Sequence, residues 1–192
     1  NYATNSVTVS AQWTVAMIEA KGRTILLGLI RQVCAVAQRN HEAVTALAMM
    51  MSQTTALLSQ GRTPEDSASN EEVMHELRGT FETILSAQIA KNIQTGPQRR
   101  AADPPNTWAV RLFAALAKEG FLYIEHIAQA IRLLTYEVDF HGGANRVRHL
   151  CILMLALRES TWDMDSDFSD GVRCGTNVVE AAVRDNWWPL QA

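Results

Sequence analysis

Three arginine residues near the middle of the chain form a pattern suited to binding phosphate. Arg99 and Arg100 are adjacent, Asp103 follows them, and Arg111 lies just inside the next apolar segment. A guanidinium group pairs through its planar fork of N–H donors with phosphate oxygens, and a helix N-terminus favours the same anion. Trp108 lies between Arg100 and Arg111 and is the candidate for stacking on a base of single-stranded RNA. The alternative is a solvated loop whose arginine side chains contact nothing.

An acidic segment near the C-terminal end is a second candidate. Residues 163–171 alternate aspartate with other residues, as at the start of an EF-hand calcium loop. Phe168 stands where that loop needs its glycine, and Cys174 stands where it needs a bidentate glutamate. We therefore expect a solvated acidic loop, or one that pairs with arginine from a neighbouring subunit, and no metal.

The remaining reactive residue types do not form a catalytic or metal-binding pattern. His141, His149, Cys151 and Cys174 lack the close spacings of a zinc site. No phosphate-binding loop, dinucleotide fingerprint, nucleophile elbow or HExxH motif occurs. We therefore expect no catalytic residues, no cofactor and no enzymatic activity.

Composition sets wider limits on the class of protein. The chain has 192 residues, 47% of them hydrophobic, and its 17 basic and 20 acidic residues give a net charge of −3. These values exclude wholesale disorder and a general basic surface for nucleic acid. The longest apolar run, Leu150–Leu157, is far shorter than the roughly 20 residues of a membrane span. Three cysteines and no secretory signal indicate a reducing compartment, so we expect a cytoplasmic or virion location and no membrane partner.

Hydrophobic periodicity predicts an all-α protein, because apolar residues recur at helical spacing and no segment alternates with period two. The expected helices are 9–38 with a break near Lys21–Arg23, 41–60 after a cap at Asn40, a helix from Asn70 to Gly96, 107–119, 121–138, 144–159 and 176–186. Loops are expected at 62–70 and 97–106 and a tight turn at Gly120. The prediction is one antiparallel bundle of six to seven helices over residues 1–192, or an array of helical hairpins, with 97–106 as the place where it could divide.

Two further expectations concern packing. Ten residues on apolar stripes are expected to be buried: Leu77, Phe81, Ile84, Phe113, Leu116, Ile124, Ile131, Leu134, Ile152 and Leu155. The consecutive residues Met49–Met51 span about 200° of a helix, so at least one faces away from any single core. That spread predicts a second buried face, either inside the domain or at a subunit contact.

The arginine segment resembles a known family. Arg99 and Arg100, followed by the helix 109–112 (Ala-Val-Arg-Leu), look like the RNA-contacting stretch of rod-shaped plant-virus coat proteins of the tobamovirus and related groups. The resemblance implies an antiparallel helix bundle that stacks sideways into a helix around single-stranded RNA. It also implies that Arg99, Arg100 and Arg111 contact phosphates and that Asp103 orients an arginine.

The end of the chain adds to this resemblance. Glu180, followed by Trp187 and Pro189, is similar to the acidic residue and tryptophan that close the core in benyvirus- and hordeivirus-like coat proteins. The first functional hypothesis is therefore a self-assembling coat or nucleocapsid-like subunit that packages single-stranded RNA. The second is a helical-repeat scaffold, resembling HEAT or MIF4G modules, that binds protein partners.

Overall fold

Helices make up nearly all of the chain that the computed structural model describes, which is residues 2–60, 64–94, 107–123, 126, 130 and 149–155. The elements are α1 (Tyr2–Lys21), the short 3-10 helix η1 (Gly22–Ile25), α2 (Leu26–Arg39), α3 (Ala43–Ser59), α4 (Pro64–Gln94) and α5 (Trp108–Lys118). Residues 149–155 are also helical. Because these described residues include no strand, the all-α prediction is confirmed. The predicted total of six to seven helices extends into residues outside this set.

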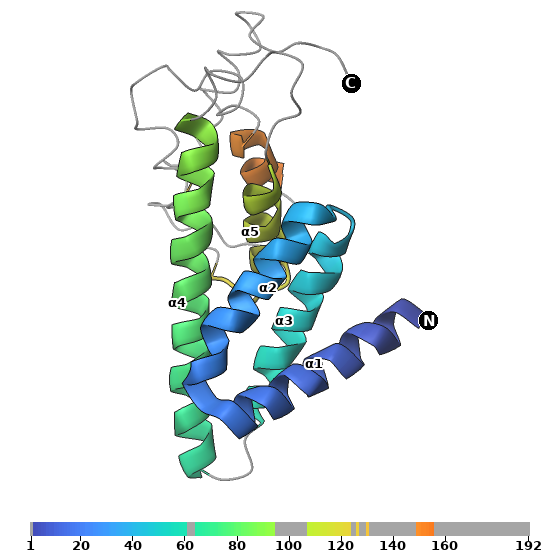
Figure 1. Cartoon of the computed structure of the whole chain (residues 1–192), viewed down its shortest axis with the longest axis vertical. Coiled ribbons are helices and arrows are strands. Elements are labelled where there is room, and N and C mark those ends of the chain that lie inside the picture. The colour runs from blue at the N-terminus through green and yellow to red at the C-terminus, as the bar shows by residue number, and fades with distance from the viewer. Residues whose placement is uncertain are drawn as a thin grey trace, which may run out of the picture.

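The predicted break after the first helix is confirmed. Gly22 takes a left-handed conformation with φ of +58°, which favours glycine, and it is the first residue of η1. Thr24 Oγ1 donates to the carbonyl of Lys21 at 2.7 Å and holds the turn. Figure 1 shows α1 and α2 diverging from this turn like the arms of a V. Asn40, the predicted cap, accepts at its Oδ1 from the Glu42 amide at 3.0 Å, just before α3.

The start of α4 differs from the sequence prediction. Residues 62–70 were expected to form a loop with Asn70 as a cap, but α4 begins at Pro64 and Asn70 lies inside it. Proline suits the first turn of a helix, which fits the start of α4 at Pro64. The Asn70 side-chain amide donates instead to the carbonyl of Leu58 at 2.9 Å, which ties α4 to the end of α3.

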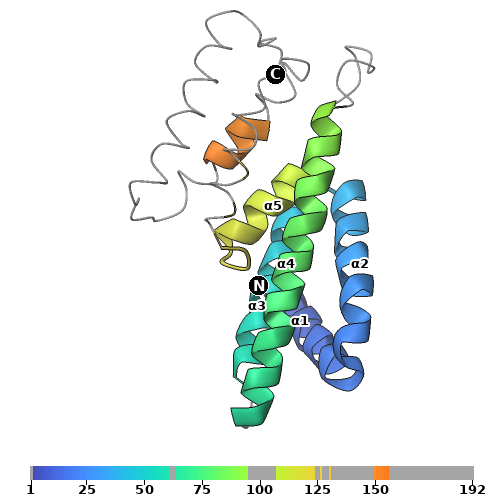
Figure 2. The same ribbon diagram turned by 90° about the vertical axis from the view of Figure 1, so that its left-hand side faces the viewer.

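The core of the described bundle is centred on α5. Eight of the eleven residues of α5 are buried, and the helix packs against α2, α3 and α4. Figure 2 shows α5 on one side of the long helix α4 and α2 on its other side. Of the described helices, none has the length and hydropathy that crossing a bilayer demands.

Most of the predicted core residues that the structure describes are enclosed. The fully buried ones are Leu77, Phe81, Phe113 and Leu116. Ile84 and Ile152 are partly buried against the same core. The prediction for Leu155 is wrong, because its side chain is 54% exposed. It lies two positions after buried Leu153, which turns it about 200° round the helix and away from the core. The other three lie outside the described residues: Ile124, Ile131 and Leu134.

The turn after α5 was predicted at the right residue, but the chain does not re-enter a helix at once. Gly120 has φ of +73°, as a tight turn requires. Residues 121–123 are non-helical, whereas a helix was expected from Phe121; His126 and Ala130 are helical. The reason is burial: Phe121 is fully enclosed, and its ring meets that of Phe81 edge-on at 5.4 Å between centroids. The linker 97–106 and the expected helix 176–186 lie outside the described residues.

Candidate functional site

The predicted RNA-binding residues fall partly within the described structure. Arg99, Arg100 and Asp103 lie outside it. Arg111 is exposed in the first turns of α5, and its Nε donates to Thr107 Oγ1 at 3.1 Å, so the guanidinium is held at the start of that helix. Trp108 is only 5% exposed and belongs to the core, so its ring is not placed to stack on a base. Trp108 is buried because it is the first residue of α5, a helix most of whose residues are enclosed by the bundle.

Among the described residues, the cysteine thiols lie in surroundings that disfavour the thiolate. The described residues contain no group of three or more histidine, cysteine or acidic side chains that could hold a metal ion. Burial raises the pKa of the Cys34 thiol to about 11, and burial also raises the pKa of Cys151. Because the thiolate is the nucleophile, both residues are weakly reactive. His141, Cys174 and the acidic segment 163–171 lie outside the described structure.

A polar cluster that sequence reasoning missed joins α4 to the turn after α5. Arg78 donates from Nε to the carbonyl of Phe121 at 2.8 Å and from Nη1 to the Tyr123 hydroxyl at 3.0 Å. Its guanidinium carbon also lies 5.0 Å from the centre of the Tyr123 ring. His126 Nε2 lies 3.3 Å from a carboxylate oxygen of Glu82. These contacts hold the turn against α4. Because they join residues more than forty positions apart, no local sequence pattern predicts them.

An apolar groove, here called the α1–α3 groove, lies between α1, α2 and α3. Its volume is about 350 Å³, and none of the residues that line it is charged. The apolar side chains that line it are Val9, Trp13, Leu29, Val33, Val36, Leu47 and Met50. Val9 is 62% exposed and Trp13 is 68% exposed, so two large apolar side chains on one wall face solvent.

The methionine prediction bears on this groove. Met51 is fully buried in the core, whereas Met50, the next residue along α3, lines the α1–α3 groove. Met50 is partly buried and also packs against the same core, so the two methionines differ in burial, and a second buried face stays a prediction.

Two of the three helices that border the groove, α1 and α3, carry few charges. Residues 1–18 and 43–60 contain no aspartate, glutamate, lysine, arginine or histidine, and these stretches supply most of α1 and all of α3. The two helices pack against each other, so their uncharged surfaces adjoin. Depletion of charge together with an exposed tryptophan and a partly buried methionine is the composition found at the centre of protein–protein interfaces.

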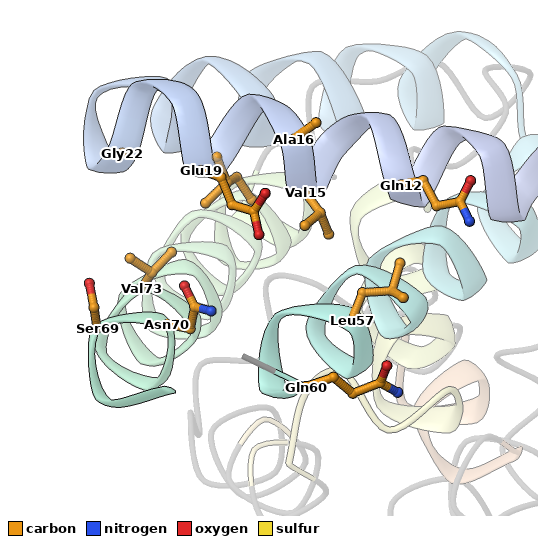
Figure 3. Close-up of a pocket in the computed structure, with 11 residues that line it drawn as sticks. Gln12, Val15, Ala16, Glu19, Gly22, Leu57, Gln60, Ser69, Asn70 and Val73 are labelled. Carbon is orange, nitrogen blue, oxygen red and sulfur yellow. The ribbon is translucent and has the colours of Figure 1, made fainter. Parts of the chain in front are cut away.

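A second, more polar cleft lies between α1, α3 and α4 (Figure 3). Its volume is about 660 Å³. Gln12 and Glu19 border it from α1, Gln60 from the end of α3, and Asn70 from α4. Asn70 is already bonded to the α3 backbone, and the other three side chains are solvent-exposed. This cleft thus lacks the desolvated polar groups that orient a small ligand in a binding pocket.

The chain matches no known family model, no curated protein and no solved structure. Among the described features, the α1–α3 groove combines an uncharged lining with large exposed apolar side chains, unlike an ordinary solvated surface.

Proposed function

We propose that this protein is a non-enzymatic structural subunit that associates with copies of itself, and that the α1–α3 groove is part of the contact. The observation that carries the proposal is the exposure of Trp13 and Val9 beside an uncharged groove. An aromatic side chain buries about 150–250 Å² when enclosed, so covering the exposed part of Trp13 is worth roughly 2–4 kcal/mol. That free energy is gained only when another surface covers the residue.

The charge distribution favours a second copy as the covering surface. Each chain has a net charge of −3, so two copies repel weakly overall. On the face formed by α1 and α3 there is little to repel, because residues 1–18 and 43–60 are uncharged. Copies that meet there desolvate no charged group and oppose no like charges, which removes the main electrostatic cost of association.

Sedimentation velocity over a wide range of protein concentration tests the proposal. We expect wild-type protein to form oligomers, and we expect Trp13→Ala to shift the equilibrium toward monomer. Leu155→Ala is the matched control, since Leu155 is also a large exposed apolar residue but lies outside the groove. A wild-type protein that stays monomeric at every concentration would contradict self-association and favour the alternative, a helical scaffold that binds other proteins.

We further propose that the assembled subunit packages single-stranded RNA through Arg99, Arg100 and Arg111. Arg111 supports this proposal because its guanidinium is exposed and held at the start of α5. The chain's small negative net charge means that binding would depend on such a local site. Any stacking contribution would have to come from a residue other than Trp108, which is buried.

RNA affinity measured at several salt concentrations tests this second proposal. Replacing Arg99 and Arg100 with alanine should weaken binding similarly for unrelated RNA sequences and flatten the log–log salt slope by roughly 0.7 per lost contact. The matched control replaces Arg31 and Arg39, two exposed arginines of α2, and should leave the slope unchanged. Absence of binding by wild-type protein at low salt would refute RNA packaging without affecting self-association.

A further inference from the structure

Helix α1 has apolar residues on two opposite sides. Its inner side is buried in the bundle through Val7, Ala11 and Ile18, whose exposed fractions are 8%, 0% and 3%. Its outer side carries a second row, here called the outer stripe, whose four members are all solvent-exposed: Val9, Trp13, Ala16 and Ala20. An amphipathic surface helix has one apolar stripe, so a helix with two is expected to be covered on both sides.

The spacing of the outer stripe indicates what kind of element covers it. Its members are separated by four, three and four positions, which places them on one line along the helix. The same alternation of three and four residues forms the seam along which two helices pair. Small residues such as Ala16 and Ala20 let a neighbouring backbone approach closely, while Trp13 projects from the surface. The stripe therefore suits a second helix.

The stripe is complementary to itself when one copy is reversed. The spacing four-three-four reads the same in both directions, so reversal superimposes the positions of the stripe on one another. Its large residues, Val9 and Trp13, occupy one half and its small residues the other. An antiparallel pair sets Trp13 against the partner's Ala16 and Val9 against the partner's Ala20. Each large side chain then has a small one opposite it, as close packing requires.

We infer that two copies of this chain associate by pairing their α1 helices antiparallel along the outer stripe. This inference rests on the proposed self-association and specifies its contact. Val9 and Trp13 belong both to the outer stripe and to the wall of the α1–α3 groove, so a partner helix on the stripe also covers that edge of the groove.

A parallel pair would be less favourable because of its packing. It would bring Trp13 against the partner's Trp13 and leave alanine facing alanine, which crowds one level of the contact and leaves a gap at the next. The antiparallel pair also places Glu19 and Lys21 beside the uncharged first half of the partner's helix.

Disulfide cross-linking distinguishes these arrangements. Val9→Cys and Ala20→Cys variants are prepared separately, one of them with a tag that changes its mass, and are then mixed and oxidised. In the antiparallel pair position 9 lies opposite position 20, so the mixed dimer forms. The two copies of position 9 are offset by eleven residues, or about 16 Å, far beyond the reach of a disulfide. Unsubstituted protein treated in the same way controls for the native cysteines.

The outcomes of this experiment separate the inference from the function on which it rests. A cross-linked dimer containing both variants supports antiparallel pairing. Cross-linking of each variant with itself would show a parallel pair and overturn the inference. If wild-type protein associates but neither cross-link forms, the inference falls while self-association stands. If wild-type protein is monomeric, both fall.

A charge placed in the stripe provides an independent test. Ala16→Glu puts a carboxylate opposite the partner's Trp13 and should weaken self-association by at least about tenfold. Ala90→Glu is the matched control, since it is the same change at an exposed position of helix α4. Circular dichroism of both variants checks that the fold is retained. Association of Ala16→Glu at the wild-type level would overturn the inference.

Discussion

Two tryptophans in this protein occupy opposite environments, although both lie on helices rich in apolar residues. Trp108 on α5 is 5% exposed, whereas Trp13 on α1 is 68% exposed. The difference follows from the neighbours of each helix: α5 packs against three other helices, and α1 uses only its inner side for the bundle. Substitutions on α5 should therefore affect folding, while substitutions on the outer side of α1 should affect association.

The largest effect is expected in α5. Phe113→Ala and Trp108→Ala should each lower the free energy of unfolding by about 3–5 kcal/mol, because each removes an enclosed aromatic ring and leaves a cavity. Urea unfolding followed by circular dichroism measures the change. For Phe113, a loss under about 1 kcal/mol would place the residue at a surface instead of the core.

The polar cluster that joins Arg78 of α4 to the turn after α5 should have the next largest effect on stability. Arg78→Ala removes hydrogen bonds to the Phe121 carbonyl and the Tyr123 hydroxyl, and the first of these leaves a buried residue's carbonyl without its charged donor. We expect a loss of about 2 kcal/mol in the free energy of unfolding. Tyr123→Phe removes only the hydroxyl bond and should cost less than about 1 kcal/mol. Equal losses in the two variants would argue against the carbonyl bond as the main contribution.

Gly120, at the end of α5, should show a smaller effect that comes from the backbone alone. Its φ is +73°, and an added Cβ would meet no atom within 4 Å, so Gly120→Ala introduces backbone strain without a clash. The expected loss is about 1 kcal/mol. Gly28→Ala is the control: Gly28 lies inside α2 with similarly open surroundings, and alanine there should stabilise the helix by roughly 0.5–1 kcal/mol.

The smallest effect on folding is expected at Trp13. Because its side chain is largely exposed, Trp13→Ala should change the free energy of unfolding of the monomer by less than about 0.5 kcal/mol. Urea unfolding at a protein concentration where only monomer is present measures this value. A loss comparable to that of Trp108→Ala would mean that Trp13 packs within its own chain, and the contrast between the two helices would disappear.

Several features of the candidate site depend on contacts between distant parts of the chain. Trp13 and Trp108 both lie on helical apolar stripes, and periodicity predicts a helix without stating which stripe another helix covers. The α1–α3 groove combines residues 9–14 with residues 29–50. The hydrogen bond from Arg78 to the Phe121 carbonyl joins residues more than forty positions apart. No local pattern contains that information. The arginine segment at 99–103 was found from residue types alone and lies outside the described residues.

The amino-acid sequence by itself determined the helical class, the break at Gly22, the tight turn at Gly120 and the burial of residues such as Leu77 and Phe81. Each of these depends on neighbours within a few positions: helical periodicity, a positive φ that suits glycine, or one apolar stripe. The tertiary structure alone decided that Trp108 is enclosed and that Trp13 is exposed. These outcomes depend on which helices pack together, because burial is a property of a residue's surroundings and not of its type.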